Sequence, residues 1–341
     1  MLHSLKIPYI LAALALLCSC KKNELENYEP FGFKKQTYFP DPAYQFEGNH
    51  QTYQSFELGR ALFYDPVLSS DSTVSCAMCH EQPHGFGSHS TALSVGVNGA
   101  IGTRNSPAIF NMAWSPAFMW DGGINHIEVM PIAPITNPVE MNETLANVVA
   151  KLQQSGRYRK LFKQAYGTEE VTEQKLLKAL TQFMMMIISD NSKYDKVRRG
   201  EASYTTAEQE GYDLFVQKCS QCHTEPLFTD YAYRNNGLDA VFTDLGRAMI
   251  TQQPGDQGKF KTPTLRNVEL TYPYMHDGRF FTLNQVLEHY NAGIEQSSTL
   301  DPALSSGIPL TNTEKLRIIT FLKTLTDYDL LNNWSLSDPP N

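Results

Sequence analysis

Apolar residues recur at intervals of three and four along two stretches of the chain, the spacing that places side chains on one face of an α-helix. The first stretch comprises Leu176, Leu177, Leu180, Phe183, Met184, Ile187 and Ile188, and the second Leu316, Ile319, Phe321, Leu322 and Leu325. Thr311 and Glu314 form a capping box ahead of the second stretch. The sequence shows no convincing run of alternating apolar and polar residues. We therefore predict a mainly α fold, in which the Met184-Met185-Met186 run fills core space rather than binding metal.

Two further helix starts are indicated by capping residues. Thr206 and Gln209 predict a helix that runs toward the cysteines near 220, and Thr282 and Gln285 predict a helix over 282–290. In the second helix Leu283, Val286 and Tyr290 share one face by their spacing. Tyr290 is therefore expected to point where Val286 points.

The N-terminus has the features of an export signal. Lys6 precedes an apolar run from Ile7 to Leu17, which is too short to span a membrane, and Cys18-Ser19-Cys20 follow. This segment is also typical of a bacterial lipoprotein, with lipidation at Cys20; the alternative is an ordinary signal peptide with an incidental cysteine. Residues 21–45 are polar and predict a flexible tether. We expect a periplasmic protein that is held to a membrane by its lipid anchor only.

The length of the chain bounds the number of its domains, and its net charge excludes some kinds of partner. A chain of 341 residues, 41% of them hydrophobic, can bury two cores of ordinary domain size. The formal net charge of −8 argues against nucleic acid or an anionic membrane surface as the partner, because both would repel an acidic protein.

The cysteines point to specific chemistry. Two of the six lie in the signal, and the other four form two Cys-x-x-Cys-His motifs, Cys76/Cys79/His80 and Cys219/Cys222/His223. Two thiols at this spacing can bond covalently to the two haem vinyl groups, and the adjacent imidazole can ligate the iron. A zinc site and a thioredoxin-like pair are the alternatives, but each leaves the histidine after both pairs unexplained. We predict two covalently attached haem c groups.

The chain contains an internal repeat. Pro107, Asn111, Trp120, Asp121 and Gly122 recur at a constant offset of 156 residues as Pro263, Asn267, His276, Asp277 and Gly278. We predict two cytochrome c-like domains in tandem, residues 46–200 and 201–330, each with one haem, followed by a tail over 331–341. Trp120 and His276 are expected in equivalent places beside the haems.

The same offset suggests that the two irons differ on the side opposite the proximal histidine. Tyr290 corresponds to Pro134, which has no side-chain donor for iron. We therefore expect one haem to be capped by Tyr290 and the other to be left open, although a buried tyrosine is also an ordinary core residue.

These residues resemble the bacterial di-haem cytochrome c peroxidase and MauG family over nearly everything from Leu58 to Asp327. The segments that carry the resemblance are Leu58-Gly59-Arg60-Ala61-Leu62-Phe63, Cys76-Ala77-Met78-Cys79-His80, Arg104-Asn105-Ser106-Pro107, Trp120-Asp121-Gly122, Asn137-Pro138-Val139-Glu140-Met141 and Pro273-Tyr274-Met275-His276-Asp277-Gly278.

The resemblance implies a role for several residues. His80 would ligate the haem that reacts with peroxide, with Glu140 as the carboxylate that helps cleave the O–O bond, and His223 would ligate the electron-transfer haem. Trp120 would couple the two haems. Asn105 and the carbonyls of Thr271 and Pro273 match a calcium site of the family, and oxygen donors suit that ion.

The chain departs from the family pattern at three places. Where many of these peroxidases have a blocking histidine, the segment reads Ser94-Val95-Gly96-Val97, so the block should be absent. The second haem is ligated by methionine in those peroxidases, whereas Tyr290 resembles the MauG branch, with Met275 as the rival ligand. Met130 stands where the family usually has glutamine near the first haem.

The resemblance implies a peroxidase that reduces hydrogen peroxide with electrons from a small exported cytochrome c or cupredoxin. MauG-like oxidation of a protein side chain is the alternative within enzymes, and a di-haem electron carrier is the alternative outside them. Homodimerisation stays open. The remaining histidines, including His84, His89, His126 and His289, are interpreted as surface groups or as groups behind the ligands.

Overall fold

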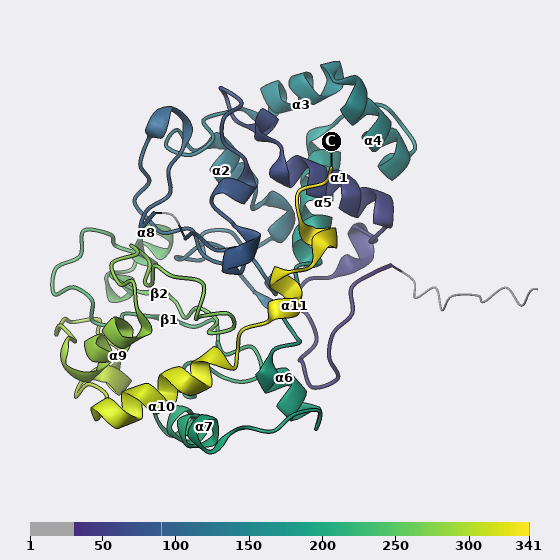
Figure 1. Ribbon diagram of the computed structural model, residues 1–341. Helices are drawn as coiled ribbons and strands as arrows, with labels where there is room; N and C mark the ends of the chain where they lie inside the picture. Colours follow the sequence, from purple (N-terminus) through teal and green to yellow (C-terminus); the bar gives the residue numbers. More distant parts are fainter. Residues whose placement is uncertain (1–30, 90, 341) are drawn as a thin grey trace, which may run out of the picture. The chain divides into compact units, whose positions relative to one another are not determined.

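A computed structural model describes residues 31–89 and 91–340. Gly32–Asn341 form one compact unit. Its helices are α1 (Tyr53–Tyr64), α2 (Ile132–Thr136), α3 (Leu145–Gln154), α4 (Gly156–Tyr166), α5 (Glu173–Met185), α6 (Lys193–Arg198), α7 (Thr206–Lys218), α8 (Ala248–Thr251), α9 (Leu283–Ala292), α10 (Asn312–Lys323) and α11 (Tyr328–Leu331), drawn in Figure 1. Short 3₁₀ turns and long loops connect them.

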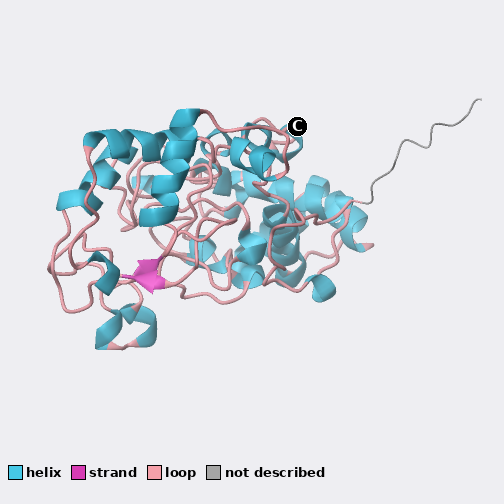
Figure 2. Ribbon diagram, turned by 90° about the horizontal axis from the view of Figure 1, so that it is seen from below, coloured by secondary structure: helices cyan, strands magenta, loops and turns pink. Residues whose placement is uncertain are grey.

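Strand structure is minimal. In the described part of the chain the only named strands are β1 (Tyr233–Arg234) and β2 (Phe260–Lys261), which pair antiparallel. Figure 2 shows this pair as a small element among helices and loops. The prediction of a mainly helical protein is confirmed.

The helices gather in two groups, and Figure 1 shows α1, α3, α4 and α5 together and α7, α9 and α10 together. In the first group α1 lies against α5 at Gly59, where an added Cβ would stand 2.0 Å from the carbonyl oxygen of Ala179. In the second group α7 lies against α10 at Gly211, and the same atom would stand 2.0 Å from the carbonyl oxygen of Arg317. Both close approaches require glycine, so the two halves of the chain also share this helix packing.

The core follows most of the predicted apolar positions. Along α5 the residues Leu176, Leu180, Phe183 and Met184 are buried, as the helical stripe predicts. Along the second stretch Phe321, Leu322 and Leu325 are buried as predicted. At the start of α10 the buried residue is Ile318, which is 1% exposed, and not the predicted Leu316, which is 64% exposed.

Capping residues explain where several helices begin. Thr282 and Gln285 form the predicted capping box of α9, and Thr311 and Glu314 form that of α10. The box of α7 consists of Thr205 and Glu208 instead of the predicted Thr206 and Gln209. In this box Thr205 donates its backbone N–H to the Glu208 carboxylate at 2.7 Å.

The two halves differ most at α9. Leu283–Ala292 correspond, at the offset of 156, to residues 127–136, which hold the 3₁₀ turn Ile127–Val129 and the five-residue α2 in place of one long helix. Pro131 and Pro134 lie within that stretch. Proline lacks the N–H that a continuous helix needs, so the helix that presents Tyr290 has no intact counterpart.

Both terminal segments of the described chain pack on the body. Phe39 is buried and its ring contacts Trp114, so the described part of the segment expected as a tether belongs to the compact unit. At the other end, Arg60 of α1 donates to the carbonyl of Ser335 at 2.9 Å, and Leu336 is buried. The predicted tail therefore folds back on the N-terminal half.

Residues 1–20, with Cys20, lie outside the described residues. No helix in the described part of the chain is long and apolar enough to cross a membrane. The boundary between two domains near residue 200 stays a prediction.

Candidate functional site

The first Cys-x-x-Cys-His motif lies in the loop after α1. Cys76 begins a 3₁₀ turn, and the Nδ1 of His80 lies 3.1 Å from the carbonyl oxygen of Phe86. A carbonyl only accepts, so Nδ1 carries the proton and Nε2 keeps its lone pair. Burial lowers the pKa of His80 to about 4, which keeps the imidazole neutral near pH 7, as a metal ligand requires.

The second motif repeats this arrangement. Cys219 follows the last residue of α7, and the Nδ1 of His223 lies 3.1 Å from the carbonyl oxygen of Phe228. Burial also lowers the pKa of His223. Phe86 and Phe228 both have a φ of 55°, a strained backbone conformation for a bulky residue. The surrounding loops hold this strain, and it aims a carbonyl at each histidine.

The backbone of the repeated prolines also faces the proximal rings. The carbonyl of Pro107 supports the protonated form of His80, and that of Pro263 does the same for His223. The recurrence of proline in the sequence repeat thus coincides with a repeated position beside each imidazole.

The residues at both motifs fit a haem c group. Within the described residues Cys76, Cys79, Cys219 and Cys222 are free thiols and partly exposed. Each pair is followed by a half-buried histidine whose Nε2 is not needed for the contact to the loop carbonyl. Two free thiols and a neutral imidazole with an available nitrogen are the donor set of a c-type haem.

Glu140 lies near the first motif. Burial, the Cys79 charge and the Glu140 carboxylate raise the pKa of the Cys76 thiol to about 12, which places Glu140 within electrostatic reach of that thiol. The Nδ2 of Asn137 donates to the Oε1 of Glu140 at 2.8 Å. Burial raises the pKa of Glu140, and the bond from Asn137 opposes that rise.

The segment Ser94–Val97 packs against Glu140 through backbone. Val97 donates its N–H to the carbonyl of Glu140 at 2.8 Å, and an added Cβ on Gly96 would stand 2.3 Å from the same oxygen. Val97 itself is 2% exposed and carries no ligating atom. Met130 is also buried, in the 3₁₀ turn region before α2.

Tyr290 lies near the second motif. Burial raises the pKa of Tyr290, the side chain of Asn236 opposes this by hydrogen bonding, and the Cys222 and Cys219 thiols add to the rise. The phenol is therefore within electrostatic reach of the attachment cysteines. Without a cation nearby it is neutral at pH 7, because the burial that raises the pKa disfavours the phenolate.

Met275, the rival ligand, contacts the same asparagine. The Nδ2 of Asn236 donates to the Sδ of Met275 at 3.4 Å. Met275 lies in the turn of the bridge between Tyr274 and Phe280, with a φ of 75°. Its counterpart at the offset of 156 is Met119, in the turn of the bridge between Phe118 and Ile124, with a φ of 68°. Met275 thus occupies a turn position that both halves share.

Trp120, His276 and Asn105 are joined by two hydrogen bonds. The indole N–H of Trp120 donates to the carbonyl of Asn105 at 2.8 Å, and the N–H of Asn105 donates to the carbonyl of His276 at 2.7 Å. The ring of His276 stacks on Phe260 at 3.7 Å between centroids. The repeated residues Trp120 and His276 are therefore joined through one backbone unit.

The residues proposed for calcium lie beside the loop that carries His276. The Nδ2 of Asn105 donates to the carbonyl of Ala92 at 2.9 Å, which leaves its Oδ1 for another partner. Because Asn105 is bonded to His276, it lies next to the loop that holds Thr271 and Pro273. The oxygen donors fit a hard cation.

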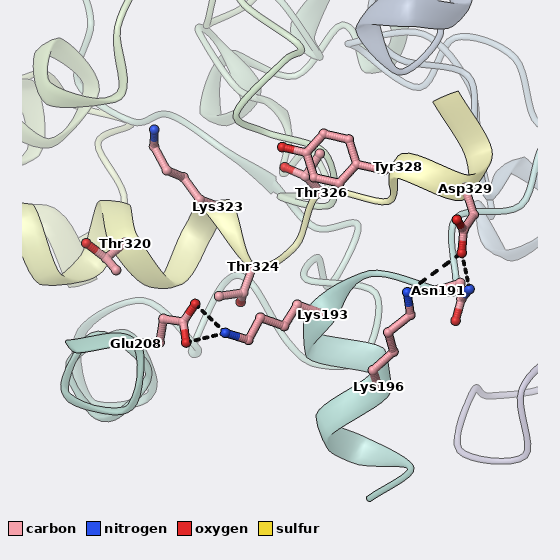
Figure 3. Close-up of a pocket in the computed structure, with 10 residues that line it drawn as sticks. All are labelled: Asn191, Lys193, Lys196, Glu208, Thr320, Lys323, Thr324, Thr326, Tyr328 and Asp329. Carbon is pink, nitrogen blue, oxygen red and sulfur yellow. Dashed lines mark hydrogen bonds and ion pairs between the residues drawn. The ribbon is translucent and has the colours of Figure 1, made fainter. Parts of the chain in front are cut away.

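A surface hollow of about 250 Å³ lies elsewhere, between α6, α7, α10 and α11 (Figure 3). Its lysines are paired with acids, since Lys193 contacts Glu208 at 2.6 Å and Lys323 contacts Glu269 at 3.1 Å. No cysteine or histidine lines it, so it is separate from the two motifs.

Comparison with known proteins identifies the family. The family model described as di-haem cytochrome c peroxidase matches residues 53–203. The methylamine utilization protein MauG of Methylophilus methylotrophus is 32% identical over 298 residues, which cover 86% of this chain and 87% of MauG. The chain belongs to the di-haem cytochrome c peroxidase and MauG family. Cytochrome c551 peroxidase of Nitrosomonas europaea is 34% identical over 279 residues and 79% of each chain.

A solved structure supports the same family. The crystal structure of a MauG-like protein associated with microbial copper homeostasis superposes with a TM-score of 0.83 at 31% identity, covering 91% of this chain and 99% of the other. Enzymes of the di-haem peroxidase family are oxidoreductases that act on peroxide, and the family implies two haem c groups. The predictions of the family and of an enzyme are confirmed.

Sequence reasoning missed several groups around these sites. Asn137 and Asn236 bond the predicted residues Glu140 and Tyr290, but no spacing rule singles out either asparagine. His289, which was interpreted as lying behind the ligands, places its Nε2 3.0 Å from the carbonyl of Asn236. The repeat could have shown the paired carbonyls of Phe86 and Phe228, because both phenylalanines follow their histidines at similar distances in the sequence.

Proposed function

We propose that this protein reduces hydrogen peroxide to water at its N-terminal site, with electrons from a small exported cytochrome c or cupredoxin. The observation that carries the proposal is the half-buried carboxyl of Glu140, which lies near Cys76 and is held by Asn137. The reaction consumes one peroxide, two electrons and two protons, and yields two water molecules. The haem ligated by His80 supplies the iron at which peroxide binds.

Glu140 moves the proton in this proposal. Asn137 occupies Oε1, so Oε2 is the atom that takes the proton from peroxide and returns it to the leaving oxygen. Burial raises the pKa of Glu140 toward neutral pH. A group whose pKa lies closer to the working pH exchanges protons more effectively in both directions.

Trp120 and the loop of His276 couple the two haem sites. The bonds Trp120 to Asn105 and Asn105 to His276 fix the indole and connect the loops that carry the repeated residues. His223 and Tyr290 would hold the second haem iron, and that haem would supply the entry point for electrons from the donor. Calcium held by Asn105, Thr271 and Pro273 would stabilise the same loops.

The absence of a histidine at Val97 has a kinetic consequence. A buried valine cannot close the N-terminal site, so the fully ferric enzyme should turn over peroxide without prior reduction. A strict requirement for reductive activation, measured as peroxide loss with and without pre-reduction, would show that another side chain closes the site.

The function is tested with the full chain carrying both haems. A reduced small cytochrome c or a reduced cupredoxin is added together with hydrogen peroxide. Two donor molecules should be oxidised for each peroxide molecule consumed. Peroxide loss without donor oxidation, or no loss at all, contradicts the proposal.

MauG-like oxidation of a protein side chain is the second candidate, and Tyr290 near the second motif favours it. Identity to the two kinds of relative is similar, 32% to MauG and 34% to the cytochrome c551 peroxidase. Mass spectrometry of exported proteins after incubation with enzyme and peroxide separates the two candidates. Only MauG-like oxidation gives an oxidised product protein in the absence of a reduced donor.

We also propose that the protein is exported to the periplasm and anchored through a lipid on Cys20. The apolar run before Cys20 and the tether-like composition after it support this.

A further inference from the structure

A cluster of potential metal ligands lies in the loop after the first motif, outside the groups used above. Glu81, His84 and His89 each place one ligating atom within 4.8 Å of the others. The rings of His84 and His89 are nearly parallel, 3.6 Å apart between centroids. The sequence indicates surface groups or groups behind the ligands for both histidines, because nothing in the spacing shows that the loop folds them together.

Two atoms of this cluster lack any partner. The Oε1 of Glu81 and the Nδ1 of His84 are buried, and no hydrogen-bond partner lies near them among the described residues. A buried polar atom without a partner costs about 1–3 kcal/mol. A carboxylate oxygen and an imidazole nitrogen that are both unsatisfied, and both in one cluster, indicate a site built for a cation.

The loop backbone holds these ligands in place. Glu81 donates its N–H to Gly87 at 3.1 Å and accepts from Phe86 at 2.9 Å, so the loop closes on itself between Glu81 and Gly87. Gln82 is anchored to the carbonyl of Asn333 at 2.8 Å. The ligands therefore sit on a fixed turn rather than on free side chains of the surface.

Tyr272 completes the arrangement from the C-terminal half. Its hydroxyl lies 2.6 Å from the Nε2 of His89, and the two rings meet edge to face at 4.8 Å. This bond fixes the orientation of the His89 ring and leaves its Nδ1 for an ion. Hydrogen bonds of this kind around metal-ligating histidines set the ring orientation and tautomer.

We propose that Glu81, His84 and His89 bind one divalent transition-metal ion of the Zn²⁺ or Cu²⁺ type, positioned by Tyr272. Two imidazoles and a carboxylate suit these ions, whereas Ca²⁺ and Mg²⁺ prefer oxygen donors alone. Ligands around zinc lie at about 2.0–2.1 Å, so tetrahedral neighbours stand about 3.3 Å apart. The two imidazole planes are nearly parallel, at 6°, so both rings must turn out of this stack for their lone pairs to face one ion.

The ion would link the loop that follows His80 to the loop that contains Tyr272. Glu81 follows His80 directly, and Phe86, whose carbonyl orients His80, lies inside the same loop. Tyr272 lies between Thr271 and Pro273 in the other half. Binding should therefore stabilise the fold as well as fill the site, because an ion that binds only the native state raises stability.

The test uses the full chain with both haems, stripped of metals and then saturated with Ca²⁺ so that an oxygen-rich site is already filled. Zn²⁺ is titrated by calorimetry, and Cu²⁺ is followed by electron paramagnetic resonance. We expect one Zn²⁺ per chain with a dissociation constant below about 1 μM, a higher melting temperature, and a copper spectrum with hyperfine splitting from two nitrogens.

Variants at four positions separate this site from any other. His84→Ala, His89→Gln and Glu81→Gln should each weaken Zn²⁺ binding by at least about 10- to 100-fold, and Tyr272→Phe by about 10-fold. The control His50→Ala removes an exposed histidine outside the loop and should leave binding unchanged. Haem absorption and melting curves check that each variant is folded.

Three outcomes overturn the proposal. One is the absence of Zn²⁺ or Cu²⁺ binding tighter than about 10 μM. Another is binding that persists unchanged in folded His84→Ala and His89→Gln. The third is Zn²⁺ binding that appears only when the Ca²⁺ is left out, which would mean that the ion had been held by oxygen donors. None of these bears on peroxide turnover, so the proposed function is tested independently.

Discussion

In the N-terminal half α1 crosses α5 at Gly59 and leads to His80, and in the C-terminal half α7 crosses α10 at Gly211 and leads to His223. Each histidine lies 3.1 Å from the carbonyl of a phenylalanine in a left-handed conformation. The same scaffold thus presents the same proximal group twice. Duplication preserved the parts that hold an imidazole neutral and fixed.

The two halves diverge where other side chains approach the motifs. In the C-terminal half the ten-residue α9 carries Tyr290 toward Cys219 and Cys222. In the N-terminal half prolines break the corresponding stretch, and the chain turns after α2 to bring Glu140 near Cys76 instead. In the function proposed above, this change in one short helix replaces a ligand, Tyr290, by an acid-base group, Glu140.

The largest effect is expected from Glu140→Gln, which removes the proton carrier of the N-terminal site alone. Peroxide turnover should fall by about two or more orders of magnitude, the usual contribution of a positioned acid-base group, while both haems stay attached. Steady-state kinetics and haem content measure this. Glu173→Gln, at an exposed position on α5, is the control. Unchanged turnover would remove Glu140 from the mechanism.

The second prediction addresses the C-terminal half. Tyr290→Phe should open the second haem or raise its potential sharply, because an anionic phenolate stabilises ferric iron whereas a thioether ligand does not. Burial raises the pKa of Tyr290, so the ferric charge must overcome that cost when the phenol loses its proton.

Met275→Leu is the matched variant, since both side chains contact Asn236. It should leave the ligation intact in absorption and resonance spectra. A spectrum that changes in Met275→Leu but not in Tyr290→Phe would assign the ligand to Met275 and would make the second half resemble the methionine-ligated peroxidases.

The third prediction tests the helix contact that the two halves share. Gly59→Ala and Gly211→Ala each place a Cβ 2.0 Å from a backbone oxygen of the facing helix, so each should lower the free energy of unfolding by about 1–3 kcal/mol or more. Gly156→Ala at the start of α4 meets only the end of Arg159 at 3.9 Å and should be nearly neutral. Thermal unfolding measures all three, and equal stabilities would disprove the equivalence of the two helix contacts.

The smallest effect concerns the pH dependence of the N-terminal site. Turnover requires Glu140 to be ionised before peroxide binds, so activity should rise with pH through a pKa above the ordinary 4.5. Asn137 favours the carboxylate, so Asn137→Ala should move this rise to higher pH. Asn147→Ala removes a similar amide donor from Glu143 and should not move it. A rise that stays in place in Asn137→Ala would show that another group controls it.

The sequence by itself determined the two attachment motifs, the repeat and the helical fold. Covalent haem attachment depends on thiols and a histidine at fixed spacing, and helices follow from local periodicity and caps, as at Thr282 and Gln285. The capping box of α7 was displaced by one residue in the prediction because both Thr205 and Thr206 satisfy the local pattern.

Only the tertiary structure decided which distant groups meet. Asn137 at Glu140, Asn236 at Tyr290, and Tyr272 at His89 are contacts that no sequence period encodes. They depend on loops whose backbones fold through long-range hydrogen bonds, such as Asn105 to His276. Local patterns fix which elements form, but the free energy of packing them selects the neighbours of each side chain, and therefore its pKa and its chemistry.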